Sequence, residues 1–260
     1  MYTNAWQDYA GDDSETNLPV VAGAGRLLGG YPSGGDGVNV LDIWQYFAPT
    51  LDFITPDIYL NNYAVVCAKY RYRKQPHFIP EQRRGEYGAR RIWIAIGSYQ
   101  ALETAPFGLD TLDIHENPFR KHCNLLATAS PFLLAARQTP DSSIGFCFDE
   151  LASTGKDSLR AITAVFGKCQ LQIERPFVFG QPGPGFGIVL LQATPHSYSL
   201  VMAFKSPFPL QIQGKYLLRF LDSSKGKLST RRQGKCGYGG HLAAMRREVD
   251  SQQRCQHQTL

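Results

Sequence analysis

The sequence of 260 residues has no apolar run that approaches the roughly 18 residues a membrane-spanning helix needs. Its first residues lack the basic start and apolar stretch of a signal peptide. The six cysteines form no C-x-x-C pair and are too sparse for a disulfide scaffold, which argues against a zinc site as well. We therefore expect a soluble protein with no membrane partner and no metal, and the cysteine usage favours a reducing, cytoplasmic compartment.

The positive net charge of +5 is concentrated at the C-terminal end of the sequence. Residues 225–260 carry eight Lys or Arg and two Asp or Glu, a net of +6, so residues 1–224 carry −1. This basic segment has one aromatic residue, Tyr238, and no helical periodicity. A basic segment can attach to phosphates, but this one favours a poorly ordered tail rather than a nucleic-acid partner.

Strand and helix patterns alternate over the first 140 residues. Strands are expected at residues 2–6, 51–60, 77–80 and 101–107, and helices at 38–47, 63–70, 88–99 and 118–136, the last interrupted near Pro131. Such alternation is typical of parallel βα units. Four units of this spacing suit half of a (β/α)8 TIM barrel, whose usual total length is about 250 residues.

Beyond about residue 140, helix patterns give way to short strands separated by turns. Strands are expected at residues 144–148, 169–173, 177–179, 187–193, 198–204 and 216–220. This spacing indicates an antiparallel β domain. The predicted fold class is therefore α/β plus all-β, with a half-barrel at 1–140, an incomplete β-rich domain at 141–224 and a tail at 225–260.

Glu81 is the first candidate for a catalytic residue. It closes the short apolar segment His77–Pro80 and precedes a charged turn and a helix. In a parallel barrel, side chains at the carboxyl ends of strands face the active site, so a carboxylate there is a candidate nucleophile or acid/base. The alternative is a solvated loop carboxylate paired with Arg83 or Arg84.

Four further residues end neighbouring strands. Asp57 and Tyr59 lie on the same face of their strand by alternation, and the Tyr59 hydroxyl could hydrogen-bond a nearby carboxylate. A core tyrosine with a satisfied hydroxyl is the alternative. Asn4 and Trp6 end the first strand, and these residue types suit a sugar hydroxyl and the apolar face of a pyranose ring. We take Asn4, Trp6 and Asp57 as candidate substrate-binding residues.

A glycine-rich segment at residues 20–29 superficially matches a dinucleotide-binding fingerprint. That site needs a helix directly after the glycines to receive the pyrophosphate. Further glycines and a proline occupy its place here. We therefore expect a loop and no cofactor, although a nicotinamide-dependent oxidoreductase remains a third interpretation.

Two long segments, YPSGGDGVNVLDIWQYFAPTLDFITPDIYL and FIPEQRRGEYGARRIWIAIGSYQALETAPFG, resemble the second half of the barrel in β-galactosidase-like glycoside hydrolases. The similarity is narrowest to family 35 members that have a family 42-like barrel and a C-terminal β domain of unknown function. It covers about residues 1–224. The resemblance implies that Glu81 is the strand-seven nucleophile, that Tyr59 contacts it from strand six, and that Asn4-Ala5-Trp6 lines the sugar site from strand five.

The resemblance also implies a residue that this sequence does not contain. In these enzymes the general acid/base is a glutamate that follows an asparagine at the end of strand four, and no Asn-Glu pair occurs in the sequence. We therefore expect a fragment of a retaining glycosidase, from a truncated gene model, that acts on a galactoside-like carbohydrate and is inactive alone. The alternative is a non-catalytic carbohydrate-binding or interaction protein.

Overall fold

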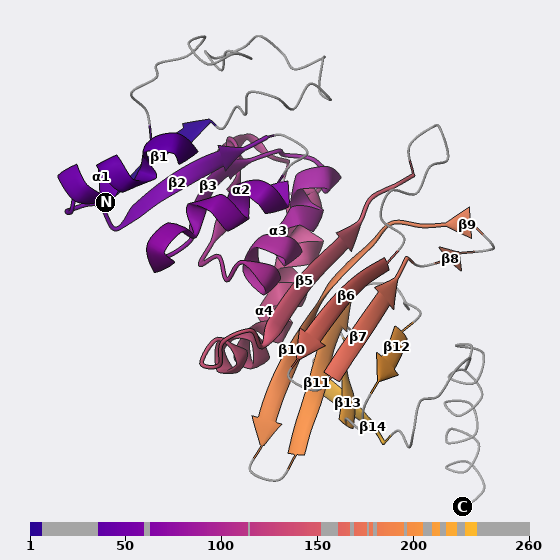
Figure 1. Ribbon diagram of the computed structural model, residues 1–260. Coiled ribbons are helices and arrows are strands. Elements are labelled where there is room, and N and C mark those ends of the chain that lie inside the picture. The colour runs from indigo at the N-terminus through magenta and orange to yellow at the C-terminus, as the bar shows by residue number, and fades with distance from the viewer. Residues whose placement is uncertain are drawn as a thin grey trace, which may run out of the picture.

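A computed structural model of the protein contains a four-stranded parallel sheet followed by a β-rich part (Figure 1). It describes residues 1–6, 36–59, 63–113, 115–151, 161–166, 169–175, 177–178, 181–194, 197–204, 210–213, 217–222 and 227–232. None of the helices in these ranges has the length and apolar character required to cross a membrane.

The parallel sheet has the strand order β1-β2-β3-β4. These strands are β1 (Tyr2–Trp6), β2 (Phe53–Ile58), β3 (Ile79–Gln82) and β4 (Thr104–Pro106). The helices are α1 (Leu41–Phe47), α2 (Tyr63–Tyr70), α3 (Glu86–Ser98) and α4 (Pro118–Ala136), with single 3-10 turns at Val38–Val40, Tyr72–Lys74 and Leu109–Thr111. The parallel βα alternation expected from the sequence is confirmed, whereas closure of the sheet into a barrel stays a prediction.

Helix α4 runs without a break through Pro131, so the expected interruption there is wrong. A proline within a helix has no N–H to donate to the carbonyl four residues earlier, which here belongs to Ala127. The Ser130 hydroxyl donates to that carbonyl oxygen at 2.8 Å. The side chain next to the proline thus supplies the hydrogen bond that the backbone lacks.

The β-rich part contains a five-stranded sheet of order β14-β13-β11-β10-β5, a three-stranded sheet of order β12-β7-β6 and a small β8-β9 ribbon. Its strands are β5 (Ser143–Phe148), β6 (Ala161–Phe166), β7 (Cys169–Glu174), β8 (Phe177–Val178), β9 (Gln181–Pro182), β10 (Gly185–Thr194), β11 (Ser197–Phe204), β12 (Leu210–Gln213), β13 (Leu217–Asp222) and β14 (Lys227–Arg232).

Two features of these sheets differ from the sequence expectation. The pair β11 and β13 is parallel, whereas the other strand pairs of the β-rich part that the structure describes are antiparallel. Strand β14 lies inside the segment 225–260 that we expected to be a poorly ordered tail, and it pairs with β13 over six residues. Residues 233–260 lie outside the described part of the chain.

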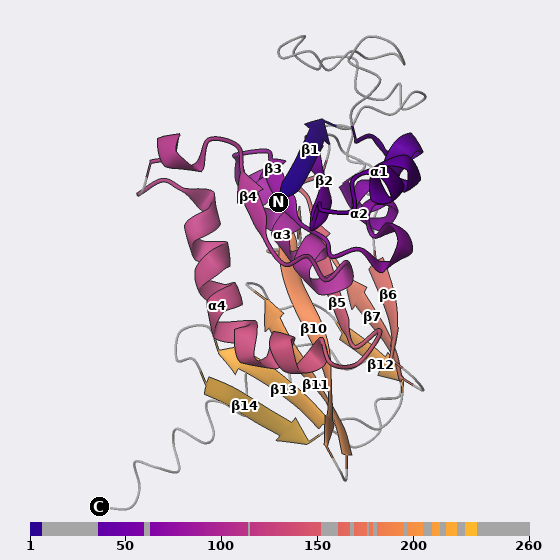
Figure 2. The ribbon, with the colours of Figure 1, turned by 90° about the vertical axis from the view of Figure 1, so that its left-hand side faces the viewer.

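Helices α3 and α4 cover one face of the five-stranded sheet, and the β6–β7 layer covers the other (Figures 1 and 2). Alternation along β5 directs Cys147 towards the helices and both Phe146 and Phe148 towards β6 and β7. On the helix side, Trp93 of α3 packs in the same buried cluster as Phe186 of β10. The α/β part and the β-rich part therefore share this hydrophobic cluster, besides one cluster that lies in each part alone, and the boundary near residue 140 stays a prediction.

Helix α3 also contributes to the core under the parallel sheet, because Ala95 packs in one buried cluster with Ile58 and Ile79. Its approach to β5 depends on two glycines. A Cβ atom on Gly145 would lie 1.6 Å from the Trp93 carbonyl oxygen, and one on Gly97 would lie 2.5 Å from the Gly145 nitrogen. The Ser98 hydroxyl donates to the Gly145 carbonyl oxygen at 2.9 Å and so holds the two elements together.

Ion pairs join the other end of α3 to the end of β5. The Arg91 guanidinium donates to both carboxylate oxygens of Asp149, at 2.7 and 2.5 Å, and lies 3.6 Å above the centre of the Tyr87 ring. Arg90 donates to Glu150 at 2.6 Å. Both arginines are buried, so these bidentate and paired contacts fix the orientation of α3 between the two sheets.

Candidate active site

The carboxyl ends of β1, β2 and β3 bring the predicted site residues together. Asp57 and Glu81 are register partners on adjacent parallel strands, and Trp6 is the register partner of Asp57 on the other side. Neighbouring strands lie about 4.8 Å apart, so the Asp57 and Glu81 backbones are immediate neighbours. Trp6 ends β1, but its side chain lies outside the described residues.

Two hydrogen-bonded pairs form at this edge. The Tyr59 hydroxyl donates to Oε2 of Glu81 at 2.9 Å, which is the tyrosine–carboxylate contact expected from the sequence. The Asn4 side-chain nitrogen lies 2.9 Å from each carboxylate oxygen of Asp57. Asn4 is exposed and Asp57 is buried, so the amide covers the carboxylate from the solvent side.

Gln82, the residue after Glu81, holds the end of β3 in place. Its side chain has no exposed surface, and its Oε1 accepts a hydrogen bond of 2.6 Å from the Tyr63 hydroxyl of α2. Its Nε2 donates to the Thr104 hydroxyl of β4 at 3.3 Å. The register between β3 and β4 shifts between Ile79 and Gln82, and such irregularities re-aim side chains near active sites. Glu81 therefore lies in an anchored strand rather than in the solvated loop that we considered as an alternative.

The electrostatics of the site are dominated by burial of acidic groups. Burial, together with the charges of Glu81 and Asp36, raises the pKa of Asp57 to about 7, against the opposing effect of the Asn4 hydrogen bond. Burial likewise raises the pKa of Asp36 to about 6, although backbone hydrogen bonds at Asp36 and Thr55 oppose this. Burial, followed by the hydrogen bond to Glu81, raises the pKa of Tyr59, so its hydroxyl remains a donor.

Two members of this site were not predicted from the sequence. Asp36 is 1% exposed, and its Oδ2 has no hydrogen-bond partner among the described residues. It follows a glycine-rich segment without periodicity, so nothing in the sequence indicated that it approaches β2. The place of Gln82 could have been inferred from the sequence, because strand alternation puts its side chain on the sheet face opposite to that of Glu81.

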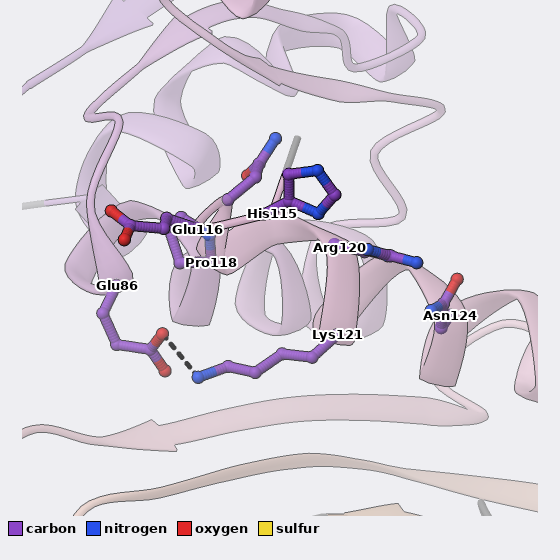
Figure 3. Close-up of a pocket in the computed structure, with 8 residues that line it drawn as sticks. Glu86, His115, Glu116, Pro118, Arg120, Lys121 and Asn124 are labelled. Atoms are coloured by element: carbon purple, nitrogen blue, oxygen red, sulfur yellow. Dashed lines mark ion pairs between the residues drawn. The ribbon is translucent and has the colours of Figure 1, made fainter. Parts of the chain in front are cut away.

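A separate hollow of about 480 Å³ lies between the first turn of α3 and the start of α4 (Figure 3). Its floor includes an ion pair of 2.7 Å between Glu86 and Lys121, and Glu86 also lies 3.2 Å from Nε2 of the buried His122. The His122 Nδ1 accepts a hydrogen bond of 2.8 Å from the Trp93 indole. Neither Asp57 nor Glu81 lines this hollow, which belongs to the contact between α3 and α4.

Within the ranges that the structure describes, no three His, Cys, Asp or Glu side chains are arranged to hold a metal ion. The glycine-rich segment at 20–29, which we predict to be a loop rather than a cofactor site, lies outside the described residues. Neither the known protein-family models nor the curated proteins match this chain.

Proposed function

We propose that this chain forms part of a retaining O-glycoside hydrolase, similar to β-galactosidases, with Glu81 as the nucleophile and a galactoside-like carbohydrate as the substrate. The observation that supports it best is the 2.9 Å hydrogen bond from the Tyr59 hydroxyl to Glu81 at the carboxyl edge of a parallel sheet. Catalytic groups of parallel α/β barrels gather at this edge. Asn4 and Trp6 lie in β1, which pairs with β2 beside this edge, where a sugar ring would lie.

In this proposal Glu81 attacks the anomeric carbon while the glycosidic oxygen departs, which gives a covalent glycosyl-enzyme that water then hydrolyses with retention of configuration. Tyr59 engages Oε2 of Glu81, so Oε1 is the oxygen available for attack. A group that protonates the leaving oxygen is also required. The Asn-Glu pair that supplies it in the enzymes this chain resembles is absent from the sequence, so we expect the chain alone to be nearly inactive on unactivated galactosides.

Covalent trapping tests the role of Glu81 without needing that acid. In 2,4-dinitrophenyl 2-deoxy-2-fluoro-β-galactoside the leaving group departs unprotonated, and the fluorine slows hydrolysis of the adduct. We expect mass spectrometry to find one fluorogalactosyl group on the peptide that contains Glu81. Glu81→Gln should abolish the adduct. The matched control is Glu103→Gln, because Glu103 is exposed and precedes β4 at the opposite edge of the sheet.

Tyr59→Phe should slow this labelling about tenfold, since one hydrogen bond to a charged group contributes about 1.5 kcal/mol or more. An adduct on another residue, or equal labelling of Glu81→Gln, would remove Glu81 from the nucleophile role. Galactoside binding measured by calorimetry without any adduct would instead favour the non-catalytic carbohydrate-binding protein.

A further inference from the structure

Asp57 is poorly placed to contact a sugar, although the sequence marks it as a substrate-binding candidate. It is 7% exposed, and the Asn4 side-chain nitrogen lies 2.9 Å from each of its two carboxylate oxygens. The carboxylate is thus buried, and both of its oxygens already face a hydrogen-bond donor. A role other than substrate binding is therefore needed to explain why Asp57 is buried beside Glu81.

The charged and titratable groups around Asp57 come from each strand or segment that packs against it. Glu81 lies on β3, Asp36 precedes the Val38–Val40 turn, and Tyr59 follows β2; Asn4 on β1 is the neutral donor. Among the residues that the structure describes, no Lys or Arg forms an ion pair with Asp57. A buried acid next to other acids, with an amide as its donor, exchanges a proton rather than keeping a permanent charge.

We propose that Asp57 is a positioning residue whose proton controls the charge beside Glu81, so that ionised Asp57 places a second negative charge at the site and protonated Asp57 does not. Each carboxylate has its own donor, Asn4 for Asp57 and Tyr59 for Glu81. The two carboxylates therefore stay in place in both states, and only the charge changes. The inference rests on the proposed function for the role of Glu81 as nucleophile.

The added charge affects the proposed reaction directly. Glycoside cleavage passes through an oxocarbenium-like transition state that carries positive charge, and a second fixed negative charge stabilises it. Burial brings the pKa of Asp57 to about 7, so the charge appears around neutral pH. We expect the rate of Glu81 labelling by the fluorogalactoside to rise about tenfold between pH 6 and pH 8, as a neighbouring charge of this kind permits.

The experiment follows both carboxyl groups by ¹³C NMR of the full chain labelled at Asp and Glu side chains. In the wild type, the Glu81 signal should shift a second time as Asp57 ionises near pH 7. In Asp57→Asn this second shift should vanish, and labelling should become independent of pH between 6 and 8. Asn4→Ala, which removes the donor of Asp57, should move the Asp57 transition to higher pH. Asp110→Asn, an exposed acid, serves as the control and should change neither curve.

The two proposals fail in different ways. A Glu81 signal that shows no second shift in the wild type, or one that keeps it in Asp57→Asn, would overturn the coupling of Asp57 to Glu81. Labelling of Glu81 that rises equally with pH in both proteins would do the same while leaving the nucleophile assignment intact. Coupled NMR signals without any labelling would contradict the proposed function and leave the coupling established.

Discussion

Asp57 should make the stability of the protein depend on pH in a direction opposite to that of most surface carboxylates. Burial raises its pKa from the ordinary 3.8 to about 7 in the folded state. The folded protein therefore binds this proton more tightly than the unfolded chain does. The stabilisation is fully present below pH 3.8 and is lost as the pH rises towards and through 7.

The two pKa values correspond to a total loss of about 4 kcal/mol of unfolding free energy. Between pH 4.5 and pH 8 the same two values give a loss of about 3 kcal/mol, because part of it has occurred by pH 4.5. Asp57→Asn keeps the shape of the side chain but has no proton to lose. The difference in unfolding free energy, wild type minus variant, should therefore fall by about 3 kcal/mol over this range.

Urea denaturation followed by circular dichroism at several pH values measures this difference directly. Using the difference cancels the other acidic groups, including Glu86 and Asp149, whose pKa values are lowered. The exposed Asp110→Asn is the control in the same titrations. A wild-type minus Asp57→Asn difference that stays constant within about 0.5 kcal/mol, or that rises with pH, would refute the assignment of a buried proton to Asp57.

Three other substitutions test the fold. Gly145→Ala should lower the unfolding free energy by about 3 kcal/mol, because its Cβ meets the backbone of α3, whereas Gly85→Ala has open space and serves as the control in the same urea titration. Pro131→Ala should raise the thermal midpoint, through about 2 kcal/mol gained when the proline ring no longer crowds the Ala127 carbonyl; a lower midpoint would contradict this. Arg91→Lys should cost about 2 kcal/mol in urea titrations, since lysine cannot reproduce the bidentate contact, and a neutral result would show that the contact is dispensable.

The alternation of helices and strands in the first half was predictable because each element has its own apolar period. The 3.6-residue period of α3 and the short apolar run before Glu81 both survive in the structure. The interruption at Pro131 was predicted wrongly because a local hydroxyl, rather than the backbone, satisfies the Ala127 carbonyl. Strands β6, β12 and β14 were missed because pairing with neighbouring strands decides their structure, and β14 has a single apolar residue in six.

The contact between Tyr59 and Glu81 was predictable because both residues end strands that a parallel sheet aligns at one edge. The pairing of Asn4 with Asp57 depends on side-chain directions at the end of β1, which no sequence pattern specifies. The approach of Asp36 was also beyond prediction, because it depends on how a glycine-rich connection returns to the sheet. The sugar and the missing acid remain subjects of the proposal.

The position of α3 between two sheets limits how the polypeptide can be divided. A protease that cut near residue 140, or a recombination event that exchanged everything after it, would strip α3 and α4 of the surface against which Trp93 is buried. Each product would expose to water the apolar surface that it contributes to this shared cluster, although each would keep a cluster of its own. A cut near residue 140 should therefore destabilise both parts, because both contribute residues to this cluster.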